Sequence, residues 1–201
     1  MDQQYSHRGS GGRRGFSVLE LLVVLSLFGI LAAIAVPLAK PAVSGYQIAG
    51  QAHALAYDVS LAKMQAASRF TQARLFVNLA ARTYRTETWD RTSGAWVAQS
   101  DTVPLPSGVG FGYGALGTPP NSQGTMDQAS ACLDASNEAI LGTSCVQFNS
   151  RGIPIDGTGT PTGSDVVYLT DGSTVYAVAV TLAGLTQLWW SPASAAGWQK
   201  Q

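Results

Sequence analysis

Side chains on which most catalytic and metal sites depend are scarce in this sequence. The 201 residues include two histidines, His7 and His53, and charged residues make up 12% of the chain. A G-x-S-x-G nucleophile elbow and an H-E-x-x-H zinc helix do not occur. The glycines of GVGFGYG (residues 108–114) alternate with Val, Phe and Tyr at strand period, which favours an edge or bulged strand over a nucleotide loop. We therefore expect a non-enzymatic protein with no catalytic residue, no cofactor and no metal site.

A strong excess of positive or of negative charge is lacking as well. Beyond residue 40 the chain has eight basic and ten acidic side chains, so this part is weakly acidic. Such a balance gives no general attraction to nucleic acid or anionic lipid. Several arginines gather between residues 69 and 91, but Glu87 and Asp90 interrupt them. We interpret this region as a solvated hairpin surface; the arginines are Arg69, Arg74, Arg82, Arg85 and Arg91.

One long apolar run stands out against this background. From Phe16 to Leu38 there are 23 residues with a single charge, at Glu20. As a helix the run measures about 34 Å, enough to cross the hydrocarbon core of a bilayer. Arg8, Arg13 and Arg14 precede it, and positive charge on one flank is retained on the cytoplasmic side. We expect a single-pass segment with its N-terminus in the cytoplasm.

Three kinds of segment could produce this run. A secretory signal peptide with a cleavage site near residues 33–35 is one, but its apolar core is usually about 7 to 15 residues long and carries no acid. A plain membrane anchor is the second, but it leaves the Glu20 carboxylate facing lipid at a cost in free energy. The third is a segment in which the carboxylate has a function and a partner, which is the default interpretation of a charge inside a membrane.

The stretch RGFSVLELLVV, residues 14–24, resembles the class III signal of type IV pilins and type II secretion pseudopilins. This resemblance implies that a prepilin peptidase removes the leader, residues 1–15, by cutting after Gly15. It also implies that the new N-terminal Phe16 is methylated and that Glu20 is the assembly residue. Family members at the extreme filament tip often lack the glutamate, so Glu20 argues against that position.

Cleavage after Gly15 would also supply a partner for the carboxylate. The new ammonium group lies four residues before Glu20, and the pair could neutralise each other within one chain or between neighbouring subunits. We favour the second arrangement, because a subunit in the wrong axial register would leave a charge unpaired among apolar side chains. Glu20 would then fix the register of an apolar helix bundle.

Downstream, the sequence predicts one long helix in two halves. Residues 16–40 form the transmembrane or filament-core half, and residues 41–72 form an amphipathic half. Pro37 predicts a break between the halves, where the helix bends or locally melts. The apolar stripe of the second half follows spacings of three and four and is expected to pack on a sheet; it comprises Ile48, Ala52, Leu55, Val59, Ala62, Ala66 and Phe70.

Residues 73–201 have the pattern of a β-rich globular domain. Residues 73–80 and 82–90 are predicted as a hairpin, and CVQFNS, DVVYLT, STVYAVAVT and LTQLWW are the strongest later strands. Residues 114–144 are rich in Gly, Pro, Ser and Asn and are expected to form a surface loop. The predicted class is α+β, with a pilin-like fold in which the long N-terminal helix packs on a C-terminal antiparallel sheet.

The two cysteines, Cys132 and Cys145, lie outside the membrane in this topology. An even pair in an oxidising compartment is a disulfide candidate, here closing a loop across the irregular insertion. The chain-entropy description gives such a loop about 3 kcal/mol of stabilisation. A metal site would need more ligands than the two histidines, one in the leader and one on the helix, supply.

The region from residue 145 to 190 resembles, more loosely, the paired strands of minor pilins and pseudopilins of the GspH/FimT type. This implies a low-copy subunit that helps initiate or join a filament from the bacterial inner membrane, with its β domain in the periplasm. The implied partners are the prepilin peptidase, other pilins or pseudopilins, the inner-membrane assembly platform and the lipid bilayer. Some FimT-like members bind DNA through basic residues near a Gly-Arg turn, but Gly184 here is followed by Leu185, Thr186 and Gln187. DNA binding, and less so a membrane-anchored periplasmic enzyme, remain the alternatives.

Overall fold

The computed structural model describes residues 17–120, 123–195 and 197–201, and for residues 36–42 it describes the backbone alone. Within these residues the chain forms one long helix, α1 (Val18–Ser68), followed by strands. It divides into two compact units, Met1–Ala42 and Val43–Gln201. The strands are β1 (Ala73–Asn78), β2 (Thr83–Asp90), β3 (Ala95–Ala98), β4 (Val103–Pro104), β5 (Gly110–Phe111), β6 (Thr143–Phe148), β7 (Pro154–Ile155), β8 (Asp165–Thr170), β9 (Thr174–Val180), β10 (Thr186–Pro192) and β11 (Gln199–Lys200).

Helix α1 continues through both of its prolines. The helical backbone includes Pro37 and Pro41 without interruption, so the prediction that the helix breaks at Pro37 was wrong as a statement about secondary structure. A proline removes one backbone donor and crowds the preceding turn, but the apolar run on its N-terminal side and the packed stripe on its C-terminal side both favour helix. A bend at Pro37 stays a prediction.

The second half of α1 packs through the predicted apolar stripe. Six of its seven members are fully buried: Ile48, Ala52, Leu55, Val59, Ala62 and Ala66. Phe70, the seventh, is 73% exposed, because the helix ends at Ser68 and Phe70 takes a left-handed conformation with φ of 51°. The backbone N–H groups of Phe70 and Thr71 bond back to the carbonyls of Ala67 and Ala66, which is a Schellman cap. The predicted helix end at residue 72 was therefore late by one turn.

Two antiparallel sheets make up the β part of the globular unit, Val43–Gln201, where one sheet was predicted. The first sheet has the order β3-β2-β1-β6-β7, with β4 also paired to β2, and the second has the order β11-β10-β9-β8-β5. The predicted hairpin pairs β1 with β2, so that Leu75 lies opposite Thr86. The later predicted strands correspond to β6, β8, β9 and β10. The α+β class, a long helix followed by antiparallel strands, is confirmed.

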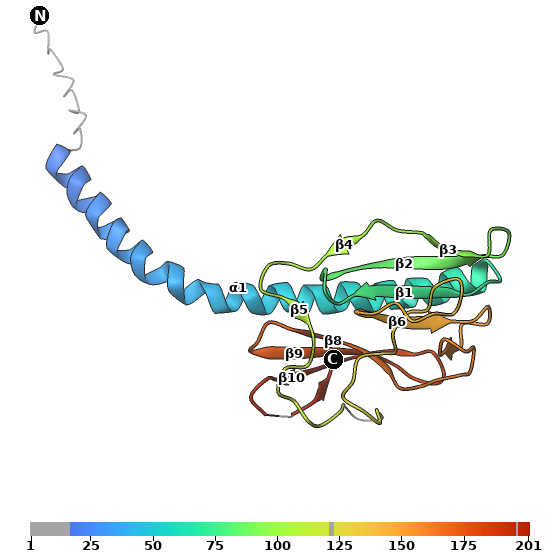
Figure 1. Ribbon diagram of the computed structural model, residues 1–201. Helices are drawn as coiled ribbons and strands as arrows, with labels where there is room; N and C mark the ends of the chain where they lie inside the picture. The colour runs from blue at the N-terminus through green and yellow to red at the C-terminus, as the bar shows by residue number, and fades with distance from the viewer. Residues whose placement is uncertain (1–16, 121–122, 196) are drawn as a thin grey trace, which may run out of the picture. The chain divides into compact units, whose positions relative to one another are not determined.

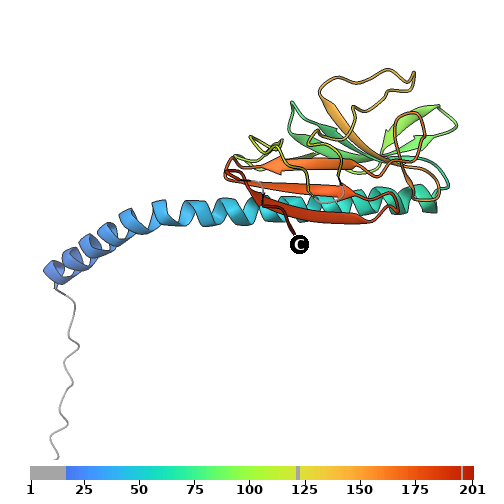
Figure 2. The ribbon, with the colours of Figure 1, turned by 90° about the horizontal axis from the view of Figure 1, so that it is seen from below.

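The main core lies between the second half of α1 and both sheets, which Figures 1 and 2 show running alongside it. Alternate side chains of each strand point into this core, for example Leu75 of β1, Val146 of β6 and Val178 of β9. The opposite face of the second sheet is covered too, since Tyr168 and Trp189 pack with Leu116 in a separate apolar cluster. Burial of both faces explains the nearly continuous apolar sequence of β8 and β9.

The insertion at residues 114–144 is only partly a surface loop. Its described residues contain no named helix or strand before β6 begins at Thr143, in agreement with its composition. However, Leu116, Ala129 and Cys132 are buried, and the Gln128 side chain exchanges two hydrogen bonds with the backbone of Tyr168. These contacts were not predicted, because irregular backbone carries no periodic signal.

Candidate assembly segment

The predicted assembly residue, Glu20, lies in the first turn of α1. The Ser17 hydroxyl accepts a hydrogen bond from the backbone N–H of Leu19 at 3.3 Å, and the Ser17 carbonyl accepts one from Leu21 at 3.1 Å. Serine is a favoured residue at a helix start for this reason. Glu20 is the acidic residue of the first turn, where a carboxylate interacts favourably with the helix dipole. Its side chain is exposed.

Apart from Glu20, the segment that contains it is apolar on every side. Val18–Ala35 has a mean hydropathy of 2.7, and none of its residues is buried. By length and composition this is a helix that could cross a membrane. Its large side chains, such as Leu22, Phe28 and Leu31, are more than half exposed, so the segment presents a continuous apolar surface.

Other residues of the predicted processing and assembly set are only partly placed. Gly15 and Phe16 lie outside the described residues. Pro37 lies within α1, as stated above, and its side chain is among those not described. Glu20 is therefore the member of the set whose surroundings the structure defines, and those surroundings are an exposed apolar helix.

Cys132 and Cys145 form a disulfide, the pair that the sequence predicts. It joins the insertion to β6 on the face of the first sheet that points away from the main core. Both cysteines pack with Phe76 of β1 and Ile140. The backbone N–H of Cys132 also donates to the Thr143 hydroxyl at 3.0 Å. The bond thus holds the irregular loop against the outer face of the first sheet.

The same outer face contains a buried ion pair that corrects one prediction. Arg74 and Glu87 are 2% and 3% exposed, whereas the sequence indicated a solvated hairpin surface. The Arg74 guanidinium contacts the Glu87 carboxylate at 2.7 Å and donates to the Leu133 carbonyl at 2.6 Å. Arg85, at the edge of the cluster, bonds the other carboxylate oxygen of Glu87 at 2.6 Å.

Aromatic rings complete the surroundings of Arg74. Its guanidinium carbon lies 3.9 Å from the ring centroid of Trp96, and Phe76 lies on the same face of the sheet. Burial lowers the pKa of the Arg74 guanidinium, and the Glu87 carboxylate opposes that effect. The face on which Arg74 lies is predictable, because Arg74 alternates with core residues of β1. The loop that covers this face has no such pattern in the sequence.

A second buried charge lies at the start of β8. Asp165 is 9% exposed, and burial, with a smaller contribution from the nearby Asp156 carboxylate, raises its pKa from 3.8 to about 6. Desolvation disfavours the ionised form of a carboxyl group, which explains why the pKa is raised.

The turn at Gly184 has a charged neighbour. The Lys63 ammonium of α1 donates a hydrogen bond to the Gly184 carbonyl at 2.8 Å.

Comparison with known proteins adds a family match. Residues 11–36 match the family described as "Prokaryotic N-terminal methylation motif". The chain carries this methylation motif. The motif spans Gly15, Phe16 and Glu20 and ends within the exposed apolar helix, so the match covers the segment whose geometry is described above.

No curated protein matches the chain. Among solved structures, the chain is similar to the minor pseudopilin EpsH from the type 2 secretion system of Vibrio cholerae. The two share 10% sequence identity with a TM-score of 0.44, over 71% of this chain and 95% of that one.

Proposed function

We propose that this chain is a minor, low-copy subunit of a filament of the type IV pilus or type II secretion class, with a structural and non-enzymatic role. In this proposal a prepilin peptidase cuts after Gly15 and methylates Phe16. Residues 16–40 lie first in the bacterial inner membrane and then in the filament core, while the globular unit lies in the periplasm. Its partners are other pilins or pseudopilins and the inner-membrane assembly platform.

One observation carries the proposal: the methylation motif is continuous with an exposed apolar helix that contains one acid. Lipid can cover such a helix, but lipid alone leaves the Glu20 carboxylate without a partner. A bundle of like helices covers the apolar surface and supplies, at the amino terminus of a neighbour, a positive charge for Glu20. The globular unit, attached through the packed half of α1, then selects neighbouring subunits.

The role of Glu20 can be tested by changing the charge alone. Glu20→Gln should leave processing and membrane insertion intact, because the amide is of similar size and less costly in lipid. Incorporation into filaments should fall on the order of tenfold, since the register-fixing ion pair is lost. The measurement is the amount of the chain recovered with sheared or crosslinked filaments, relative to the amount in the membrane.

A matched control keeps the charge. Glu20→Asp retains a carboxylate in the first helical turn and should restore most of the incorporation. Equal incorporation of Glu20→Gln and the unchanged chain would contradict the charge-pairing account. Loss of the Glu20→Gln protein from the membrane fraction would instead assign Glu20 to insertion.

DNA binding is not proposed, because two of the cations it would use are engaged elsewhere. Arg74 is buried in its ion pair with Glu87, and the Lys63 ammonium is bonded to the Gly184 carbonyl at the turn. The residues after that turn include Leu185, which is 59% exposed. An exposed apolar side chain at this turn fits contact with another protein better than contact with phosphate.

A further inference from the structure

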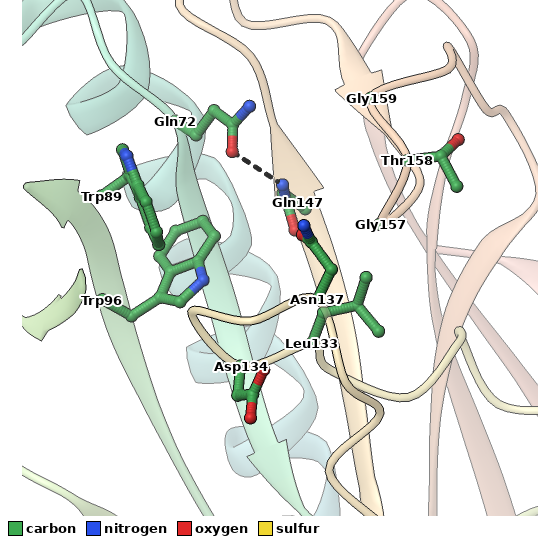
Figure 3. A pocket seen from close by; sticks show the side chains of 10 residues that line it. All are labelled: Gln72, Trp89, Trp96, Leu133, Asp134, Asn137, Gln147, Gly157, Thr158 and Gly159. Carbon is green, nitrogen blue, oxygen red and sulfur yellow. Dashed lines mark hydrogen bonds between the residues drawn. The ribbon is translucent and has the colours of Figure 1, made fainter. Parts of the chain in front are cut away.

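A cleft opens on the outer face of the first sheet, beside the buried Arg74. Its volume is about 310 Å³, at the lower end of the range for small-molecule sites. Figure 3 shows the indoles of Trp89 and Trp96 on one side and the side chains of Gln147 and Asn137 on the other. Gln72, at the start of β1, and the turn at Thr158 complete the walls. The cleft lies wholly within the globular unit.

Trp89 borders more than one hollow. It lines this cleft and also two neighbouring hollows of about 380 and 280 Å³, one next to Arg69 and one next to Asn149. Its orientation is fixed by an edge-to-face contact with Trp96, with the ring centroids 5.4 Å apart. Trp96 is in turn held under the Arg74 guanidinium. The structure therefore presents a rigid indole with open surface, supported by a buried ion pair.

Amide groups face this indole with unused hydrogen-bonding capacity. The Gln147 side-chain N–H donates to the Gln72 side-chain oxygen at 3.1 Å, as the dashed line in Figure 3 marks. Within the described residues this is the hydrogen bond that joins lining side chains, so the Gln72 amide nitrogen and the Gln147 amide oxygen are available to a ligand. One is a donor and the other an acceptor, which suits hydroxyl groups.

Asn137 is held at the mouth of the cleft by its own turn. The Asp134 carboxylate accepts hydrogen bonds from the backbone N–H groups of Ser136 and Glu138, at 2.8 and 2.9 Å. Asn137 between them has φ of 63°, a conformation that asparagine and glycine tolerate best. The disulfide anchors the same loop to β6. The backbone at Asn137 is thus held by the fold, and its exposed side chain lines the mouth of the cleft.

The lining favours a neutral, hydroxyl-rich ligand. None of the ten residues that line the cleft is a lysine or arginine, and Asp134 adds negative charge, so phosphate or nucleic acid finds no counter-charge there. A purely apolar ligand would leave the amides unpaired. A sugar ring presents C–H groups to an indole and hydroxyls to amides, and the cleft offers both.

We propose that this cleft binds one unit of a neutral glycan, with the sugar ring against Trp89 and its hydroxyls on Gln72, Gln147 and Asn137. The site is a ligand-binding function separate from filament assembly, and it does not rest on the function proposed above. Its failure and the failure of the assembly proposal are distinguishable, because binding is measured on the isolated full-length chain.

The test is isothermal titration calorimetry of the full-length chain with three neutral trisaccharides: cellotriose, maltotriose and chitotriose. The protein is kept in phosphocholine micelles, because glucoside or maltoside detergents would compete for the cleft. At least one trisaccharide should bind saturably, with a dissociation constant of about 1 mM or lower. Chitotriose, which carries acetamido groups, reports whether the cleft prefers N-acetylated sugars over plain hexoses.

Variants locate the binding on the cleft. Trp89→Ala should weaken it at least about tenfold, and Trp89→Phe, which keeps a ring, should weaken it less. Asn137→Gly suits the left-handed backbone and should cost about threefold without affecting the fold. Trp198→Ala is the matched control, since this partly exposed indole packs on Tyr168 of the second sheet and should leave binding unchanged.

Two results would overturn the proposal. One is the absence of saturable binding of all three trisaccharides up to about 10 mM. The other is binding that survives unchanged in both Trp89→Phe and Asn137→Gly, variants chosen because they keep the fold even if Trp89→Ala does not. Near-ultraviolet circular dichroism of each variant establishes that the globular unit is folded.

Discussion

At the scale of single residues, the least expected feature is charge taken out of water. Arg74 and Glu87 lie in consecutive strands and face away from the main core. A hairpin that packs on a core with one face is expected to expose the side chains of its other face to solvent. The disulfide loop covers them instead, and the Leu133 carbonyl and the Trp96 ring satisfy the guanidinium. Because each charge is paired, removing one partner alone would leave the other buried and uncompensated.

Asp165 provides a prediction about pH. Its folded-state pKa of about 6 lies above the ordinary value of 3.8, so between these values the folded protein binds a proton more tightly than the unfolded chain. The stability this group contributes is fully present below about pH 4 and is lost as the pH rises through about 6. Asp165→Asn should therefore raise the free energy of unfolding on the order of 1–2 kcal/mol at about pH 7.5 and have little effect at about pH 3.5.

Urea unfolding of the full chain in micelles, at the two pH values, measures this difference. Asp101→Asn, the same change at an exposed position, is the matched control and should have little effect at either pH. A change in stability for Asp165→Asn that is the same at both pH values would show that burial of the ionised carboxylate is not its cause.

At the scale of elements, periodic sequence predicted structure well and irregular sequence did not. The stripe from Ile48 to Ala66 was predicted and is buried, because one helical face meets a continuous core. Phe70 follows the same spacing but is exposed, since periodicity does not show where a helix stops. The strands β6, β8, β9 and β10 follow their predicted apolar patterns. The cleft was missed because its lining comes from β2, β3, β6 and loops far apart in the chain.

The disulfide leads to a prediction about the stability of the globular unit. Cys132 and Cys145 are 13 residues apart, and in the chain-entropy description a loop of this size contributes about 3 kcal/mol. Reduction, or replacement of both cysteines by serine, should lower the free energy of unfolding of the globular unit by about 2–3 kcal/mol. Urea unfolding with and without a reductant measures the effect. The double serine variant is the control, because it should not respond to the reductant, and an unchanged midpoint on reducing the native chain would contradict the prediction.

At the scale of the whole molecule, the two units differ in composition and in the exposure of their apolar side chains. The unit that ends at Ala42 contains the methylation motif and the exposed apolar helix, and the unit from Val43 contains the core, the disulfide and the cleft. The first unit has the composition to be covered by lipid or by like helices, whereas the second buries its own apolar surface. The proposed subunit would thus use one unit to join a filament and keep the other free for recognition.

We propose that the chain is processed and then assembled through its methylation motif. Mass spectrometry of the N-terminal peptide, in sheared surface filaments and in the remaining envelope, tests it most directly. We predict a chain that begins at an N-methylated Phe16, in the filaments for a pilus subunit or in the envelope for a pseudopilus or basal subunit. A variant with a bulky residue at Gly15 is the control and should keep its leader. An unmodified leader on the native chain, or a new terminus near Ala35, would contradict the account.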